Sequence, residues 1–270
     1  MLSLELFALF AVVGSVAGFF SGLLGVGGGI IITPLLATSL TAIYPEETAT
    51  HAAIATSLAA IFFTSAPGAV VHAVRREADW KIVILITAGA SVGSLAVGLS
   101  AANIPGTTLR FMLSVFLLYT AYSMFYPSRR ETSITHALSS DKALPAAGMF
   151  IGGMAALLGI GGGVLSAPLL AARGLSIKRC IGTWAVYNNP LAFFAAAGYI
   201  VTSASLDDLP EYAVGYVYLP ALFGITTFSM MFAYFGARRT GDYSELVLRR
   251  LLGGIVGILA LRLLYFTLWG

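Results

Sequence analysis

The sequence predicts an all-α polytopic membrane protein of two inverted repeats, each with about five apolar segments and a discontinuous half-helix after a glycine-rich break. Three observations carry this prediction: an apolar composition, a glycine motif that occurs twice, and basic residues that alternate between loops. Charged residues make up 10% and apolar residues 58% of the 270 residues, and the mean hydropathy is +0.90. A soluble domain carries about 25% charged residues, so this chain has too little charge to cover a soluble surface.

The chain carries no pattern of a metalloprotease, a phosphate loop or a metal protein. It has no H-E-x-x-H, no Walker A lysine after its glycines and no metal-spaced cluster of Cys and His. Its single cysteine, Cys180, excludes an intrachain disulfide. We therefore expect no enzymatic activity, no metal, no cofactor and no nucleic-acid partner. The expected partners are the lipid bilayer and a small substrate.

Ten apolar segments can be counted along the chain. Most of them reach the ~20 residues that a helix needs to cross a bilayer, but the second and seventh are in the range of a half-helix. The segments lie at 4–24, 29–43, 52–74, 81–102, 109–126, 144–158, 163–174, 180–202, 213–236 and 247–268. A hydrophilic stretch after the fifth divides the chain into a first membrane repeat (1–126), a cytoplasmic linker (127–143) and a second, inverted repeat (144–270).

A glycine-rich stretch occurs once in each half. Leu23 to Ala37 reads LLGVGGGIIITPLLA, and Leu157 to Ala171 reads LLGIGGGVLSAPLLA. Ten of the 15 positions are identical, three more exchange one aliphatic residue for another, and the offset is 134 residues. Gly18 and Gly152 keep the same offset. A glycine break repeated at corresponding positions of two apolar halves is typical of secondary transporters with discontinuous helices.

Basic residues mark one side of the membrane. All of the 15 Lys and Arg residues except Arg110 and Arg262 fall in or beside every second loop, and positive charge favours the cytoplasmic side. Each repeat holds an odd number of segments, so the second is inserted upside down relative to the first. We expect a multi-pass protein of the cytoplasmic (inner) membrane with both termini outside.

The two glycine breaks are candidates for a substrate site. The candidate residues are Gly25, Gly27, Gly28 and Gly29 in the first break and Gly159, Gly161, Gly162 and Gly163 in the second. Broken backbone at membrane depth is tolerated where it is buried in protein or lines a cavity. The first N–H groups of a helix carry about half a positive charge, so each half-helix offers an anion site. The alternative is that these glycines only allow close helix packing.

The start of the first half-helix is open between two positions. It begins either at Gly29 or at Pro34, with Thr33 as the N-cap and proline at the first helical position. In the second half Ala167 replaces the threonine, so such a cap would not be shared by the two halves.

Polar residues inside the apolar segments would complete the site. Alignment of the halves and the turns that follow give the candidates Thr56, Ser57, Thr183, Trp184, Asn188 and Asn189. Two amides before Pro190 suit an unwound turn that faces a cavity. The hydroxyls have an alternative role, because they commonly bond back to their own helix. All acidic residues fall in loops or at segment ends, which favours an anionic substrate over a cation held by carboxylates.

Three other side chains have two possible roles each, and a fourth has an unusual position. Arg262 is either a substrate counter-ion or a snorkelling side chain near a segment end. His51 and His72, at the ends of the third segment, either take part in proton coupling or are wet interfacial residues. Arg110 is the one basic residue expected at an outside loop.

The chain resembles the sulfite exporter TauE/SafE family over essentially its whole length. The resemblance lies in the duplicated G-x-G-G-G-x-x-x-x-P, in Ala55-Thr56-Ser57-Leu58, in Arg75 with Asp79-Trp80, and in Gly182-Thr183. It implies a membrane transporter that moves sulfite, sulfoacetate or related organosulfonates, mostly outward. Trp184 stands where the first repeat has Ser57, so the two half-sites differ chemically.

We therefore expect a secondary transporter that exports a small sulfur-containing anion by alternating access, with proton coupling as an open option. A passive anion channel and a membrane accessory protein without transport are the alternatives. The sequence leaves the oligomeric state open, with a homodimer among the options.

Overall fold

The computed structural model describes residues 4–24, 28–126, 141–203, 211–238 and 245–269, and within them the chain is almost entirely helical. The α-helices are α1 (Leu4–Leu24), α2 (Gly29–Ser39), α3 (Glu46–Val74), α4 (Trp80–Ser100), α5 (Gly106–Phe125), α6 (Leu144–Leu158), α7 (Gly162–Ala172), α8 (Ile177–Thr202), α9 (Leu219–Arg238) and α10 (Glu245–Trp269). Short 3₁₀ turns are η1 (Leu40–Ala42), η2 (Ala101–Asn103) and η3 (Asp141–Ala143), and β1 (Ala213–Val214) pairs antiparallel with β2 (Val217–Tyr218).

Helices form because apolar segments in a bilayer must satisfy their backbone hydrogen bonds internally. Side-chain caps mark two of the starts: Asp79 accepts from Ile82 N before α4, and Ser176 accepts from Arg179 N before α8. Among the described residues, five helices are long and apolar enough to cross a membrane, namely α3, α4, α5, α9 and α10. The chain is thus a polytopic membrane protein.

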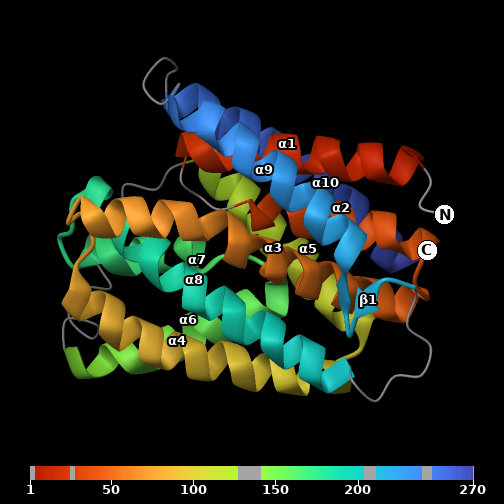
Figure 1. Cartoon of the computed structure of the whole chain (residues 1–270), viewed down its shortest axis with the longest axis horizontal. Coiled ribbons are helices and arrows are strands. Elements are labelled where there is room, and N and C mark those ends of the chain that lie inside the picture. The colour runs from red at the N-terminus through yellow and green to blue at the C-terminus, as the bar shows by residue number, and fades with distance from the viewer. Residues whose placement is uncertain (1–3, 25–27, 127–140, 204–210, 239–244, 270) are drawn as a thin grey trace.

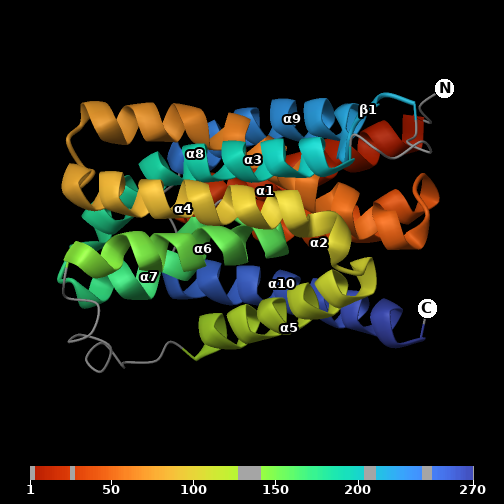
Figure 2. The same cartoon turned by 90° about the horizontal axis from the view of Figure 1, so that it is seen from below.

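The helices run side by side along the long axis of the molecule (Figures 1 and 2). The most extensive packing joins α1 to α9, α4 to α6, α4 to α8, α3 to α8, and α5 to α10. In each of these five pairs, a helix from one half of the sequence packs against a helix from the other half. The two halves are therefore interleaved rather than separate.

Glycines bring the helices of two of these pairs, α1–α9 and α4–α6, into backbone contact. A Cβ at Gly18 of α1 would lie 2.3 Å from Ser229 O of α9, and one at Gly152 of α6 would lie 2.2 Å from Ala90 O of α4. One turn earlier, Gly14 packs in the same way on Ile225, and Gly148 on Ile86. Small residues at helix interfaces permit this close approach in membranes.

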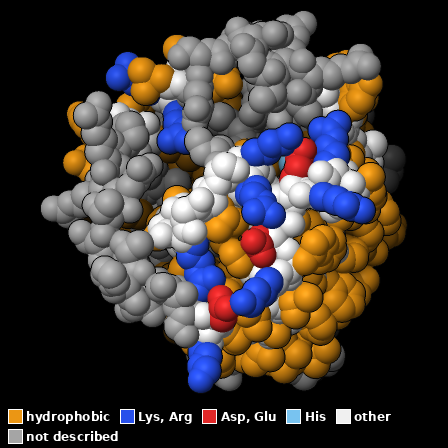
Figure 3. All heavy atoms as spheres, turned by 90° about the vertical axis from the view of Figure 1, so that its left-hand side faces the viewer, with side chains coloured by type: hydrophobic (Ala, Val, Ile, Leu, Met, Phe, Trp, Pro, Cys, Tyr) orange, Lys and Arg blue, Asp and Glu red, His pale blue; other side chains and the backbone are white. Residues whose placement is uncertain are grey.

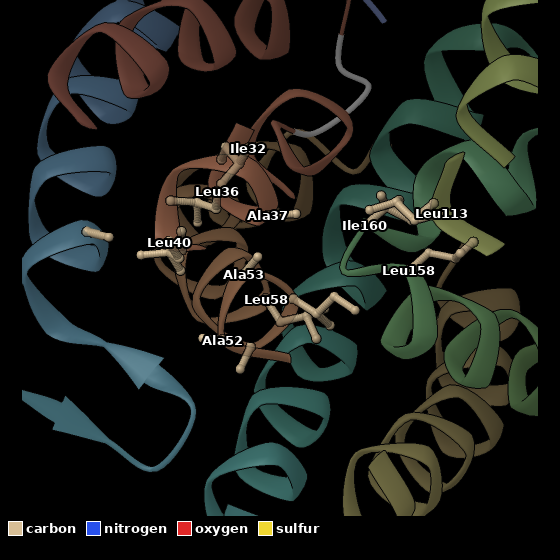
Figure 4. Close-up of a cluster of buried hydrophobic side chains, with 14 of the residues drawn as sticks. Ile32, Leu36, Ala37, Leu40, Ala52, Ala53, Leu58, Leu113, Leu158 and Ile160 are labelled. Carbon is tan, nitrogen blue, oxygen red and sulfur yellow. The ribbon is translucent and has the colours of Figure 1, made fainter. Parts of the chain in front are cut away.

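The largest buried cluster surrounds the first half-helix. Figure 4 shows Leu36 of α2 and Leu40 of η1 on one side of this cluster, Leu58 of α3 below them, and Ile160 of the second break on the other side, near Leu113 and Leu158. All of these side chains are at most 1% exposed. The half-helix is therefore held inside the protein, where an interrupted helix is tolerated.

Charged side chains gather at one end of the molecule (Figure 3), which we call the basic end. It is formed by the starts of α4 and α8, the end of α7 and η3, and it carries Lys81, Arg173 and Lys178. Both termini of the chain lie at the opposite end (Figure 1), which we call the terminal end.

Ion pairs at the basic end tie the halves together. Asp141 pairs with Lys81 and accepts from Arg173 at 3.2 Å. Glu77 lies 3.0 Å from Lys178 Nζ and 2.7 Å from His72 Nδ1. Hydrogen bonds from Lys81 and then Arg173 hold the pKa of Asp141 below its usual value, and those from Lys178 and then His72 lower the pKa of Glu77.

Asp141→Asn is expected to lower the thermal stability slightly at pH 7 and not at all in strong acid. Because the pKa is lowered by folding, the carboxylate stabilises the fold above the unfolded pKa of about 3.9, and this contribution is lost as the pH falls through the folded pKa. Thermal unfolding of both proteins from pH 7 down to strong acid, below the folded pKa, checks this. A stability gap that widens on acidification would contradict it.

Two local predictions were wrong, and one of the alternatives left open by the sequence is excluded. The ninth segment does not begin as a helix at residue 213, because 213–218 form the β1–β2 hairpin around Gly215, which has φ +58°. The expected unwound turn before Pro190 is absent, since α8 is continuous from Ile177 to Thr202. His51 is not wet, because it is 3% exposed and its ring nitrogens lie 3.0–3.1 Å from the carbonyls of Glu47, Ala101 and Ile104.

Candidate functional site

The second glycine break joins α6 to α7 within a few residues. Gly159 ends α6 in the left-handed region with φ +65°, where a side chain would be strained. Ile160 and Gly161 then lead into α7, which begins at Gly162. The glycine is needed here because it turns the chain without a Cβ, and a Cβ would come within 2.9 Å of Thr33.

The two breaks meet in space. Gly29 is the first residue of α2, and a Cβ on it would lie 3.0 Å from both Gly159 O and Ile160 Cα. Gly28 precedes it and is buried, whereas the predicted site residues Gly25 and Gly27 lie outside the described residues. The start of the first half-helix therefore lies against the link that leads into the second half-helix, although about 130 residues separate them in the sequence.

The carbonyl of Gly159 is bound from the other half of the chain. The Thr33 hydroxyl of α2 donates to it at 2.5 Å, and the Ser57 hydroxyl of α3 donates at 3.0 Å. Of the two starts that the sequence left open for this half-helix, the structure has the one at Gly29, so Pro34 lies inside the helix and Thr33 is not its N-cap. Thr33 instead fixes the partner break.

Thr33→Val and Ser57→Ala are expected to be non-additive. Each single change leaves the Gly159 carbonyl with one donor and costs ~1 kcal/mol of stability, whereas the double change leaves a buried acceptor unpaired and costs ~1–3 kcal/mol more than the sum. Unfolding in detergent measures this. Thr38→Val is the control, since among the described residues the Thr38 hydroxyl donates only within α2, to Pro34 O and Leu35 O. Simple additivity would show that the carbonyl finds another donor.

Two residues of α8 hold the start of α7. Asn188 Oδ1 accepts from Gly162 N at 2.8 Å, and the Tyr187 hydroxyl donates to Gly162 O at 2.9 Å. A Cβ at Gly161 would lie 2.9 Å from Asn188 Oδ1, so this glycine makes room for the amide. Because the Asn188 oxygen is taken by the backbone, its amide N–H₂ is the end available to a ligand. Tyr187 was missed from the sequence, although an aromatic hydroxyl beside two buried amides is a signal of a shared polar network.

The other predicted polar residues bind across helices. Asn189 Nδ2 donates to Phe62 O of α3 at 2.7 Å. Thr56 Oγ1 accepts from Tyr218 N, and Thr183 Oγ1 accepts from Asp79 N, each at 3.0 Å. The predicted alternative of bonding within their own helix does not hold for these residues. Both threonines use a lone pair of the hydroxyl oxygen, which leaves the O–H proton to donate.

Trp184 covers the start of α7. Its half-buried indole lies 3.5 Å from the position of a Cβ on Gly163. In the first half the small Ser57 occupies the aligned position and donates across to Gly159. The two half-sites are thus chemically different, as the sequence predicts.

The remaining candidates lie away from the breaks. Arg262 is exposed and its guanidinium lies 5.9 Å from the ring of Phe266, which favours the snorkelling interpretation. Arg110 is 2% exposed and its Nε donates to Thr50 Oγ1 at 3.2 Å, so it is a buried residue rather than an outside loop charge. His72 pairs with Glu77 at the basic end.

Comparison with known proteins identifies the protein family of this chain. The family model described as "Sulfite exporter TauE/SafE" matches residues 10–263. The chain belongs to the TauE/SafE family. This is a family of transporters and not of enzymes.

Several relatives of this TauE/SafE chain are named probable membrane transporter proteins. One from Haemophilus influenzae is 30% identical over 239 residues, which cover 88% of this chain and 90% of the relative. One from Methanocaldococcus jannaschii is 26% identical and covers 97% of this chain and 96% of the relative. YdhB of Bacillus subtilis is 27% identical and covers 90% and 96%. No solved structure matches the chain.

One enzyme-like pattern in this TauE/SafE chain has a packing role. Residues 89–93 read G-A-S-V-G, the spacing of a nucleophile elbow, which needs a sharp turn between a strand and a helix. They lie inside the continuous helix α4, and a Cβ at Gly89 would lie 1.8 Å from Pro145 O of α6. The glycines therefore serve close packing with α6.

A hollow of about 370 Å³ opens at the basic end. It lies between the start of α4, η3 and the end of α7, and its lining includes Asp79, Lys81, Asp141 and Arg173.

Proposed function

We propose that this protein is a secondary transporter that exports a small sulfur-containing anion, such as sulfite, sulfoacetate or a related organosulfonate, across the cytoplasmic membrane. Membership of the TauE/SafE family and relatives named probable membrane transporter proteins support the class. The observation that carries the site is the contact of Gly29, the first residue of α2, with Gly159 and Ile160, which lead into α7 at Gly162.

The electrostatics of this meeting point favour an anion. Each helix start carries about half a positive charge, and two of them adjoin here. The neighbouring side chains offer neutral donors: the amide of Asn188 and the hydroxyl protons of Thr56 and Thr183. The acidic residues of the chain stand in loops or at helix ends, so no carboxylate in the sequence is placed mid-helix to repel an anion. We propose that the substrate binds between the breaks, with the glycines, Ser57, Trp184 and Asn189 completing the site.

The proposed transport cycle rests on two inverted repeats, 1–126 and 144–270, joined by a linker at 127–143. Three features support the duplication: the 134-residue offset of the glycine motif, the reciprocal pairs α1–α9 and α4–α6, and the matching contacts of Gly18 and Gly152. Rocking of one repeat against the other would expose the site to each side in turn. The basic end would face the cytoplasm and both termini the outside. One chain suffices for this cycle, and a homodimer would be compatible with it.

Flux in proteoliposomes tests the proposal. Purified protein is reconstituted with labelled sulfite or sulfoacetate inside, and efflux is followed with and without an imposed pH gradient. Saturable efflux that other sulfonates inhibit is the expected result, and its response to the gradient reports proton coupling. Unitary currents in planar bilayers would identify a channel instead. Absence of flux above empty liposomes for a panel of sulfur oxyanions and sulfonates would refute the proposed cargo.

A further inference from the structure

Two buried threonine hydroxyls make reciprocal contacts between the halves. Thr56 of α3 accepts from Tyr218 N, the residue just before α9. Thr183 of α8 accepts from Asp79 N, the residue just before α4. Both distances are 3.0 Å, and both threonines are fully buried. In each case a threonine of one half binds the backbone at the start of a helix from the other half.

The two contacts lie toward opposite ends of the molecule. Helix α3 begins at the terminal end and α8 at the basic end (Figure 1). Thr56 lies in the first half of α3, and Thr183 lies in the second turn of α8. The Thr183 bond lies toward the basic end. Thr56 is level with the second break, between Ile54 and Ser57, which both contact Gly159, and its bond runs from there to the hairpin residue Tyr218.

The contact nearer the basic end closes a packed seam. A Cβ on Gly182 would lie 2.7 Å from the backbone of Glu77, so the turn between α3 and α4 rests directly on α8. Lys178 of α8 holds the same turn through Glu77 at 3.0 Å. Opening the site toward this end requires this turn to leave α8, and the Thr183 bond must then break.

The contact nearer the terminal end closes a second seam. Here Tyr218 belongs to the β1–β2 hairpin, and the hairpin is fixed to α8 through Tyr216 N, which donates to Ser203 Oγ at 2.9 Å. The Tyr216 ring also stacks on His51 of α3, with centroids 5.1 Å apart. Opening toward this end requires the hairpin and the start of α9 to leave α3, which breaks the Thr56 bond.

We propose that these two hydrogen bonds are the gates of the transport cycle: Thr183 with Asp79 N closes the basic side, and Thr56 with Tyr218 N closes the terminal side. This inference rests on the proposed function, because alternating access requires two gates that open in turn. Both bonds are formed here, as in an occluded form. An anion that accepts either O–H proton would polarise the hydroxyl and strengthen its bond to the gate, so substrate binding would favour occlusion.

The chain carries its own reporter for the first gate. Cys180 is the single cysteine, lies about one turn before Thr183 on α8 and is 5% exposed. Its rate of alkylation by N-ethylmaleimide in the purified full-length protein, without any substrate, measures how often the seam at the basic end opens.

Thr183→Val is expected to raise the rate of Cys180 alkylation roughly three- to tenfold, the factor that one lost hydrogen bond contributes to an equilibrium. Thr56→Val is expected to leave that rate unchanged or lower it, because it favours opening at the other end. Thr183→Ser should restore the wild-type rate. Thr64→Val is the matched control, since Thr64 bonds only to Ala60 O and Ile61 O of its own helix.

The second gate needs a cysteine placed in the hairpin. In a Cys180→Ala background, Val217→Cys reports the terminal end, because Val217 is 3% exposed and precedes Tyr218. Here Thr56→Val should raise alkylation and Thr183→Val should not. If Thr183→Val fails to fold, Thr183→Ala replaces it.

Two results would overturn the gates: unchanged rates in the threonine variants, or the same increase at both ends from either variant. The outcome is separable from the proposed cargo. Normal flux with unchanged alkylation would refute the gates and leave transport intact. Opposite changes at the two ends without flux of any sulfur anion would refute the cargo and leave the gates intact.

Discussion

Gly29→Val is expected to abolish substrate flux while the protein still inserts and folds. A Cβ at this position would lie 3.0 Å from Gly159 O and Ile160 Cα, and 2.7 Å from the flexible tip of Ile61. The first two atoms are backbone of the other break and have no rotamer in which to move away. The branched side chain would therefore wedge the two half-helix starts apart. Overpacking of this kind costs ~1–3 kcal/mol, and each 1.4 kcal/mol is about tenfold in an equilibrium or a rate.

A series of three Gly→Val variants, with decreasing steric overlap, tests this expectation more closely. A Cβ on Gly162 would meet only side chains, Tyr187 and Leu191 at 3.0 Å each, which can shift by a few tenths of an ångström. Gly162→Val is therefore expected to reduce flux less than Gly29→Val. Gly254→Val on α10 is the matched control, because a Cβ there meets nothing within 4 Å, and it should transport normally. Proteoliposome efflux, normalised to the amount of folded protein, gives the order, and normal flux from Gly29→Val would exclude the meeting of the breaks as the substrate site.

The half-helices were predictable because their causes are local. Glycine repeats and a short apolar run after each repeat are visible in the sequence, and the structure confirms two helices of 11 residues, α2 and α7. The all-helical membrane architecture likewise follows from composition and segment length. These features depend on neighbours in the chain and on the bilayer, both of which sequence patterns describe well.

The partners of the polar side chains were not predictable because they are remote in the sequence. Thr33 binds Gly159 from 126 residues away, and Asn189 binds Phe62 from 127 residues away. A sequence shows that a buried amide or hydroxyl must be satisfied, but not which backbone group will satisfy it. The same reason applies at Pro190: α8 continues through the proline, and the amide of Asn189 is satisfied by Phe62 O of α3, a partner that the sequence does not reveal.

The β1–β2 hairpin was missed for a different reason. Residues 213–218 are short and apolar, so they fit the start of a helix as well as a strand, and periodicity does not separate the two. Gly215, with φ +58°, turns the chain. Contacts of Tyr216 with Ser203 and His51 then hold the hairpin in place. A local sequence pattern does not reveal these tertiary contacts.

Gly18→Ala and Gly152→Ala are expected to destabilise the fold by similar amounts. Each added methyl would overlap a backbone carbonyl of the facing helix, Ser229 O at 2.3 Å in one case and Ala90 O at 2.2 Å in the other. Backbone cannot rotate away, so α1 must separate from α9, and α6 from α4. The expected loss is ~1–3 kcal/mol for each, measured by unfolding in detergent with Gly254→Ala as the control.

The difference between the free energies of unfolding lost in the two variants is more informative than either loss alone. If the chain is an inverted duplication, the two contacts are the same contact made twice, once by each half, and their energies should agree within about 0.5 kcal/mol. The double variant should then lose the sum, because the two helix pairs share no residues at these contacts. A large loss from one variant and none from the other would mean that one pair adapts to the methyl, and that the halves, although alike in sequence, are not equivalent in the folded protein.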